Sequence, residues 1–226
     1  QMCIRDRLCL DKTGTLTCGT AGDVLRGEAR EAVAYFQSAG IDVRVLTGDT
    51  PQAAETIARA LHLPGPIVDC ALLPDDGALA AAAAFGGVFA NATAGQKAQL
   101  IAALRADGRC VGMVGDGVND IAAFRTADCS VALPHGCEAG RSAAQLVLLD
   151  EDLLALPDIV REAQHIIGSV TRTAELFVKK SLTSMIVLLI ALITPLEYPF
   201  SPRQLSIVAL FTIGLPALAF TFERES

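Results

Sequence analysis

The feature that most constrains this chain is a seven-residue run, DKTGTLT at positions 11–17, directly after the apolar stretch 8–10. A short apolar run followed by an acid, a glycine and threonines is typical of a buried strand that ends in a phosphate-binding loop. A carboxylate at that position can attack a phosphoryl group, while the glycine lets backbone N–H groups approach phosphate oxygens. The competing interpretation is an ordinary turn, because Asp, Thr and Gly are common turn formers.

Two further polar motifs follow apolar runs in the same way. TGD at 47–49 follows the run 43–46, and GDGVND at 115–120 follows the run 110–114. Apolar runs that alternate with helical patterns predict a doubly wound parallel sheet covered on both faces. Because sites in such sheets lie at the carboxyl ends of strands, the three motifs are expected to converge on one pocket.

The hydrophobic periodicity predicts the individual elements of this sheet. Strands are expected at 8–10, 41–46, 67–68, 88–90, 110–114, 130–133 and 144–149. Helices are expected from 23–26 to Gly40, and at 51–61, 75–85, 94–107 and 120–127.

With these three motifs in this order, the chain resembles the P-type ATPases. Further landmarks are the D-x-L-R-x-x-A pattern at 23–29 and GQK at 95–97. The resemblance implies a haloacid dehalogenase-like phosphorylation domain. It also implies that Asp11 becomes an aspartyl phosphate, with Mg²⁺ as cofactor and ATP as substrate. It implies three sets of site residues. The catalytic residues are Asp11, Lys97, Thr47, Gly48 and Asp49; the cofactor-binding residues are Thr13, Thr47, Gly48, Lys97 and Asn119; and the metal-binding residues are Asp11, Thr13, Asp116 and Asp120.

Lys97 and Thr13 each have an alternative interpretation. A lysine at the start of an amphipathic helix is usually a solvated surface residue, but the resemblance places Lys97 at the phosphoryl group as a point charge. Phosphatases of the same fold have a second Asp two residues after the nucleophile as general acid–base, and this chain has Thr13 there. The threonine favours a pump, whose phosphorylated intermediate must persist, over a membrane-anchored phosphatase.

The composition separates a soluble part from an apolar part. The net charge of −7 over 226 residues argues against a nucleic-acid partner. Scattered cysteines without a C-x-x-C pair favour reduced, buried thiols. Beyond Leu176 the chain has two nearly uncharged stretches, at about 181–200 and 205–222, long enough to cross a lipid bilayer. Lys179 and Lys180 before the first stretch place that end, and the phosphorylation domain, in the cytoplasm of a multi-pass plasma-membrane protein.

These observations predict four segments. Residues 1–7 are expected to be foreign to the fold or disordered, 8–150 to form the phosphorylation domain, 151–175 an amphipathic linker helix, and 176–226 a transmembrane helical hairpin. In the family a nucleotide-binding domain separates DKTGTLT from the D-x-L-R pattern, whereas here only residues 18–22 do. The actuator domain is also expected to be missing, so the chain corresponds to roughly a third of a pump. If the missing domains are on another chain, that chain would be a partner. The alternative is that this chain is a truncated inactive remnant or a non-catalytic membrane protein.

The transported cation is weakly specified. The polar residues within the apolar stretches are hydroxyls, which often bond only to the preceding turn; these are Thr183, Ser184, Thr194 and Thr212, with a break expected near Gly214 and Pro216. No soft-ligand motif such as Cys-Pro-Cys is present in the sequence. The segments 147–173 and 199–203 look most like a bacterial, E-type branch of cation pumps, and this resemblance suggests calcium or another hard cation.

Overall fold

The computed structural model describes residues 6–18, 24–150, 152–194 and 201–222, and the chain divides into two units after Val160. The first unit is an α/β fold on a seven-stranded parallel sheet of order β5-β6-β4-β1-β7-β8-β9. The strands are β1 (Arg7–Asp11), β4 (Asp42–Leu46), β5 (Ile67–Asp69), β6 (Val88–Ala90), β7 (Val111–Gly115), β8 (Cys129–Ala132) and β9 (Leu146–Val147). The predicted doubly wound sheet is confirmed.

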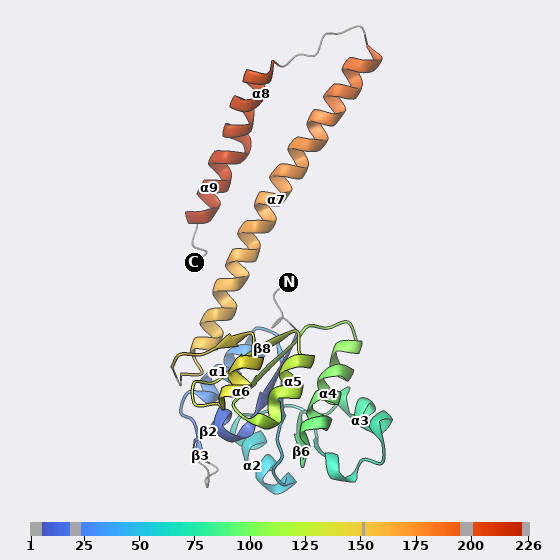
Figure 1. Ribbon diagram of the computed structural model, residues 1–226, viewed down its shortest axis with the longest axis vertical. Coiled ribbons are helices and arrows are strands. Elements are labelled where there is room, and N and C mark those ends of the chain that lie inside the picture. The colour runs from blue at the N-terminus through green and yellow to red at the C-terminus, as the bar shows by residue number, and fades with distance from the viewer. Residues whose placement is uncertain (1–5, 19–23, 151, 195–200, 223–226) are drawn as a thin grey trace. The chain divides into compact units, whose positions relative to one another are not determined.

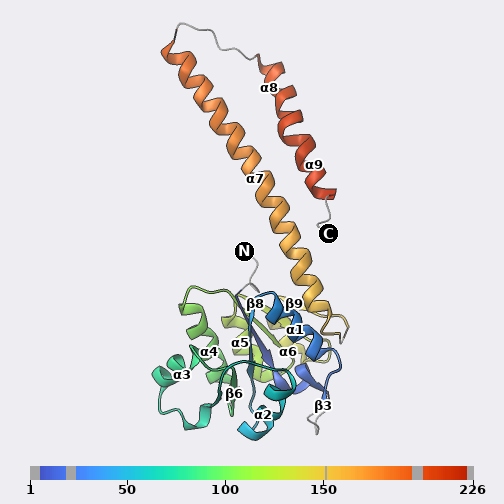
Figure 2. The same ribbon diagram turned by 180° about the vertical axis from the view of Figure 1, so that it is seen from behind.

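Helices cover both faces of this sheet, which Figures 1 and 2 show from its two sides. They are α1 (Ala29–Ser38), α2 (Pro51–Ala60), α3 (Asp76–Ala83), α4 (Ala94–Ala106), α5 (Ile121–Thr126) and α6 (Glu138–Ala143). Alternate residues of the central strand β1 face opposite layers. Leu8 joins the apolar cluster of α1 and α2, whereas Cys9 joins that of α3, α4 and α5. Burial in this layer raises the pKa of the Cys9 thiol to about 12.

The expected helix start at 23–26 is wrong. Val24–Leu25 forms a short strand, β3, which pairs antiparallel with β2 (Thr17–Cys18), and helix α1 begins only at Ala29. The Arg26 N–H donates to the Leu16 carbonyl at 2.9 Å, so the backbone here is engaged by the hairpin and not by a helical turn. Residues 19–23, between β2 and β3 in the sequence, lie outside the described part of the chain.

The expected domain start at Leu8 is two residues late. Arg7 is a buried residue of β1, and its N–H donates to the Cys110 carbonyl at 3.1 Å. Its guanidinium forms ion pairs with Asp42 and Asp107 at 3.5 and 3.3 Å. The Asp6 carboxylate accepts from the Cys110 N–H at 2.9 Å, so both residues belong to the fold.

The expected boundary at 175 does not coincide with any break in secondary structure. One helix, α7, runs from Ala155 to Ile193 through both the amphipathic and the apolar segments. No proline follows Pro157 within it, and Gly168 alone does not break it. Its first turns belong to the α/β unit, where Leu156 and Val160 are buried in the core.

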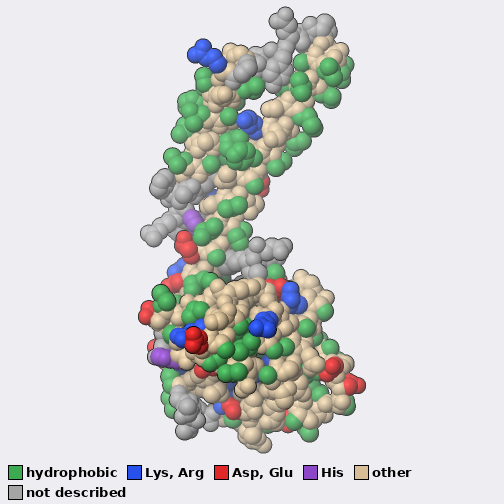
Figure 3. Space-filling view, in the orientation of Figure 1, with side chains coloured by type: hydrophobic (Ala, Val, Ile, Leu, Met, Phe, Trp, Pro, Cys, Tyr) green, Lys and Arg blue, Asp and Glu red, His purple; other side chains and the backbone are tan. Residues whose placement is uncertain are grey.

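The second unit, from Arg161 onward, presents many apolar side chains to its surface (Figure 3). By length and composition, α7 is the one helix of the described residues long and apolar enough to cross a membrane. The helix α8 (Pro202–Ala209), a wide turn at Leu210–Gly214 and α9 (Leu215–Phe222) follow. Their apolar helical stretch, Arg203–Ala219, is shorter. The expected end of the first stretch, at 195–200, lies outside the described residues.

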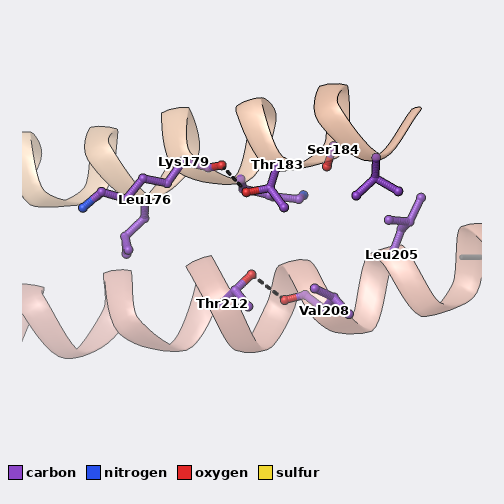
Figure 4. Close-up of a pocket in the computed structure, with 9 residues that line it drawn as sticks. Leu176, Lys179, Thr183, Ser184, Leu205, Val208 and Thr212 are labelled. Carbon is purple, nitrogen blue, oxygen red and sulfur yellow. Dashed lines mark hydrogen bonds between the residues drawn. The ribbon is translucent and has the colours of Figure 1, made fainter. Parts of the chain in front are cut away.

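Within this unit α7 and α8 border a cavity of about 280 Å³ (Figure 4). Leu176, Val187, Leu205 and Val208 make its walls mainly apolar. The Thr183 hydroxyl donates to the Lys179 carbonyl at 2.9 Å, and the Thr212 hydroxyl donates to the Val208 carbonyl at 2.6 Å. These hydroxyls therefore satisfy their own helices, as the sequence suggested, and the wide turn lies near the expected break at Gly214.

Candidate active site

Three neighbouring strands bring the three motifs to one edge of the sheet. β4, β1 and β7 lie side by side, and their carboxyl ends carry Thr47, Asp11 and Asp116. Asp11 pairs with Leu46, the residue before Thr47, and Leu10 pairs with Val114 two residues before Asp116. The predicted convergence at this edge is present in the structure.

Lys97 reaches the same edge from helix α4. The helix begins with a capping box in which Thr93 and Gln96 bond reciprocally, and this fixes its first turn. Lys97 is 4% exposed, and its Nζ lies 2.5 Å from Asp11 Oδ1 and 2.7 Å from Asp120 Oδ1. Lys97 is therefore not a solvated surface residue but the shared cation of two buried carboxylates.

The site has an excess of negative charge. Burial, with the nearby charge of Asp120, raises the pKa of Asp11 to about 7, although Lys97 opposes the shift. Burial and the same neighbour also raise the pKa of Asp116. Burial alone would lower the pKa of Lys97, but the charges of Asp11 and Asp120 hold it above its usual range. One lysine does not balance these carboxylates, so the site favours a further cation.

The carboxylates are arranged to hold such a cation. One oxygen each from Asp11, Asp116 and Asp120 lie within 4.8 Å of one another. Hard oxygen donors in this number suit Mg²⁺, which completes its shell with water and phosphate oxygens. The chemistry of the donor set therefore fits the expected metal. Asp120 already contacts Lys97, which is consistent with a supporting role for Asp120.

Gly14 brings the backbone close to this carboxylate cluster. It lies in the loop Lys12–Leu16, here called the Asp11 loop, and has a left-handed φ of 74°. A Cβ built on Gly14 would lie only 1.7 Å from Asp116 Oδ2. Both the conformation and the close approach require glycine.

The second motif forms a separate group on the other side of Asp11. Lys12 Nζ lies 2.7 Å from Asp49 Oδ2, and the Thr13 hydroxyl donates to the same oxygen at 3.4 Å. The hydrogen bond from Lys12 contributes most to holding the pKa of Asp49 below its usual range. The buried Thr47 accepts the Asp49 N–H through its hydroxyl at 3.1 Å, and Gly48 lies between them. Asp49 thus binds Lys12 and Thr13 of the Asp11 loop and is not part of the Asp11, Asp116 and Asp120 cluster.

Asn119 is an expected site residue whose side chain does not join the Asp11, Asp116 and Asp120 cluster. It is exposed on the turn Val118–Asp120, and among the described residues no hydrogen bond joins its side chain to the cluster. The carbonyl of Thr13 as a metal ligand remains a prediction.

Two contacts of the Asp11 loop were not expected from the sequence. One is the Lys12–Asp49 ion pair, for which opposite charges at neighbouring strand ends were a usable signal. The other is Arg26, whose Nη2 donates to the Gly14 carbonyl at 3.0 Å. Arg26 belongs to the D-x-L-R-x-x-A pattern, but this pattern does not indicate its partner, because the contact depends on the β2–β3 hairpin.

Comparison with known proteins agrees with this geometry. Residues 19–128 match the haloacid dehalogenase-like hydrolase family. The calcium-transporting ATPase CtpE of Mycobacterium bovis is 36% identical over 208 residues, covering 85% of this chain and 26% of the relative. These relatives are named calcium- or cation-transporting ATPases, and the chain is their homologue. It spans about a quarter of the length of these relatives.

Two more similarities extend the comparison. The probable cation-transporting ATPase exp7 of Streptococcus pneumoniae is 32% identical, covering 90% of this chain and 27% of the relative. A zinc-transporting PIB-type ATPase in its E2.Pi state superposes with a TM-score of 0.62 at 20% identity, covering 88% of this chain and 27% of that structure. At that identity the structural match establishes the fold alone.

Proposed function

We propose that this chain is part of a cation-transporting P-type ATPase in which Asp11 accepts the γ-phosphoryl group of ATP. The observation that carries the proposal is the buried contact between Asp11 Oδ1 and Lys97 Nζ beside Asp116. A carboxylate at a strand end, with a fixed ammonium at 2.5 Å and a cation-binding cluster around it, has the parts that phosphoryl transfer requires.

The residues have distinct roles in the proposed transfer. A carboxylate oxygen of Asp11 attacks the γ-phosphorus, the bond from phosphorus to the β,γ-bridging oxygen breaks, and ADP leaves with that electron pair. Lys97 donates to the phosphoryl oxygens and offsets their charge. Thr47 and Gly48 line the phosphoryl side, and Asn119 supports the residues that would hold the metal. Asp11, Asp116 and the Thr13 carbonyl, with Asp120 in support, would hold Mg²⁺, which would supply the positive charge that lets two anionic groups meet.

The β2–β3 hairpin bears on which phosphoryl donor this chain can use. The hairpin β2–β3 occupies the position where the family inserts its nucleotide-binding domain, and it pairs Thr17 with Leu25 and Cys18 with Val24. We therefore expect a small phosphoryl donor such as acetyl phosphate to serve this chain better than ATP. A nucleotide-binding domain on a separate chain would restore the use of ATP.

The second unit would supply part of the transport path. We propose that α7 and α8–α9 cross the bacterial plasma membrane as an antiparallel pair, with the α/β unit in the cytoplasm. Lys179 and Lys180 mark the cytoplasmic end of the first span. The names of the relatives favour calcium or another hard cation as the transported ion.

A membrane-anchored phosphatase is the second candidate. The same fold, Asp11, Mg²⁺ and Lys97 would serve both activities, and Thr13 is the residue that separates them. A phosphatase needs a proton donor for the leaving group, which threonine does not provide at neutral pH. Turnover of small phosphoesters at enzymatic rates would favour this candidate.

The deciding experiment is phosphate incorporation into the full chain in detergent, from labelled ATP and separately from acetyl phosphate. We expect an acid-stable, hydroxylamine-labile label that requires Mg²⁺, which is the behaviour of an acyl phosphate. Asp11→Asn should abolish it, while the matched control Asp76→Asn, at an exposed carboxylate of α3, should not. A label that survives in Asp11→Asn would refute the assignment of the nucleophile, and no label from either donor would refute activity of this chain.

A further inference from the structure

The Asp11 loop is held by two hydrogen bonds from Arg26, a residue outside the three motifs, and we call this pair of bonds the Arg26 brace. Arg26 follows strand β3 and bonds to the loop twice: its N–H donates to the Leu16 carbonyl at 2.9 Å, and its Nη2 donates to the Gly14 carbonyl at 3.0 Å. The two acceptors lie two residues apart on the same turn. Arg26 is only partly exposed, so water does not compete freely for these carbonyls.

We propose that Arg26 is a positioning residue of the active site, which fixes the Gly14–Thr15 peptide plane. This inference rests on the proposed function, because the loop it fixes directly follows Asp11 and carries Thr13. A peptide unit is planar, and its C=O and N–H point in opposite directions. A guanidinium that holds the Gly14 carbonyl therefore also sets the direction of the Thr15 N–H.

The loop needs such a brace because glycine by itself does not hold the turn. Gly14 adopts a φ of 74° in the loop, but glycine populates positive and negative φ almost equally. A flip of this peptide would reverse the direction of the Thr15 N–H, while Gly14 stays packed against Asp116 with no room for a Cβ. An ordered peptide here also limits the motion of the adjoining peptide, which carries the Thr13 carbonyl predicted to bind the metal.

The geometry favours arginine over another donor. Nη2 of the planar, rigid guanidinium donates to the Gly14 carbonyl, while the backbone N–H of the same residue donates to the Leu16 carbonyl. A lysine would retain the charge but not the planar, rigid group. The brace also links the site to the hairpin β2–β3, because Thr17 pairs with Leu25, the residue before Arg26.

The test compares Arg26→Met and Arg26→Lys with a matched control, Arg30→Met. Arg30 also donates a side-chain hydrogen bond to a carbonyl, that of Ala60 at 3.1 Å, but on an exposed part of α1. The first readout is amide hydrogen exchange of the Asp11 loop in the full chain without substrate. We expect roughly tenfold faster exchange in Arg26→Met, partial rescue in Arg26→Lys, and no change in Arg30→Met.

The second readout is the rate of phosphorylation by acetyl phosphate. Arg26→Met should lower the maximal rate at least tenfold with little change in the donor concentration at half-maximal rate, since the brace orients the loop and does not touch the donor. Unchanged loop exchange in Arg26→Met, or equal acceleration in Arg30→Met, would refute the brace. A third outcome separates the two proposals. If amide exchange of the Asp11 loop is faster in Arg26→Met but the wild-type protein takes no phosphate label, the brace is upheld and the proposed function is refuted.

Discussion

Lys97→Met is the substitution whose outcome follows most directly from this structure. It removes the ammonium that lies between Asp11 and Asp120, at 2.5 and 2.7 Å, and leaves both carboxylates buried. Breaking a buried ion pair by deleting one partner typically costs about 3–5 kcal/mol, because the remaining charge keeps no compensation. For a unit of this size that corresponds to a fall in Tm of about 6–20 °C.

The loss should depend on pH, and its sign is fixed by Asp11. The pKa of Asp11 is raised to about 7 in the folded protein, so the folded state holds a proton that the unfolded chain releases near pH 4. The stability contributed by this group therefore falls as pH rises from about 4 to about 7, and is constant above. At pH 5.5 Asp11 is mostly neutral and the lysine matters less; at pH 8 it is charged and the lysine matters most.

The assay is thermal unfolding of the full chain in detergent with EDTA, at pH 5.5 and pH 8. Lys12→Met is the matched control, because Lys12 is also a buried lysine but pairs with Asp49, whose pKa is lowered. Asp49 stays charged at both pH values, so the control should lose about the same stability at each. Equal losses for Lys97→Met at the two pH values would refute the argument that Lys97 stabilises the ionised form of Asp11.

Three further predictions follow from the same contacts. Mg²⁺ affinity, measured by calorimetry without nucleotide, should rise about tenfold per pH unit below pH 7 and level off above, because the metal displaces the proton of Asp11. An affinity that does not change between pH 5.5 and pH 8 would contradict this. Gly14→Ala should weaken Mg²⁺ binding at least tenfold and lower the Tm, because its Cβ would overlap Asp116 Oδ2; a Gly95→Ala control, with no atom within 4 Å of its Cβ, should not. Phe36→Ala should cost about 3–5 kcal/mol in urea unfolding, since Phe36 is 1% exposed in the α1 layer, whereas truncating Phe85, which is 60% exposed, should cost far less.

The sheet and the site were largely predictable because both depend on local patterns. Strands such as Val88–Ala90 have apolar runs bounded by turn residues, and each motif stands at a strand end where parallel topology brings it to its neighbours. Lys97 followed only from the family resemblance, because a lysine at the start of an amphipathic helix is usually solvated. In the structure the capping box of α4 fixes the first turn from which Lys97 reaches the site.

The remaining contacts depend on pairing that the local pattern does not encode. Val24 and Leu25 have helical spacing with the residues of α1, yet they pair with Thr17 and Cys18 because the chain returns after only a short connection. Arg7 lies in a charged segment that suggests a foreign lead-in, yet Asp42 and Asp107 balance its charge from distant parts of the chain. In the same way, the contact between Arg26 and Gly14 exists only once the hairpin has formed.

The protonation of Asp49 bears on how long an aspartyl phosphate at Asp11 would persist. Hydrolysis is fast when a neighbouring group can donate or accept a proton near neutral pH. Thr13 stands where a phosphatase has that acid, and its hydroxyl is turned to Asp49. Asp49 is the nearby carboxylate that could replace it, but its bond to Lys12 lowers its pKa and keeps it ionised and occupied. Lys12→Met should free this ionised carboxylate to accept a proton from an attacking water and so shorten the lifetime of the phosphoenzyme, which a chase with unlabelled donor would measure. A lifetime equal to that of the wild type would show that the Lys12–Asp49 pair does not protect the intermediate.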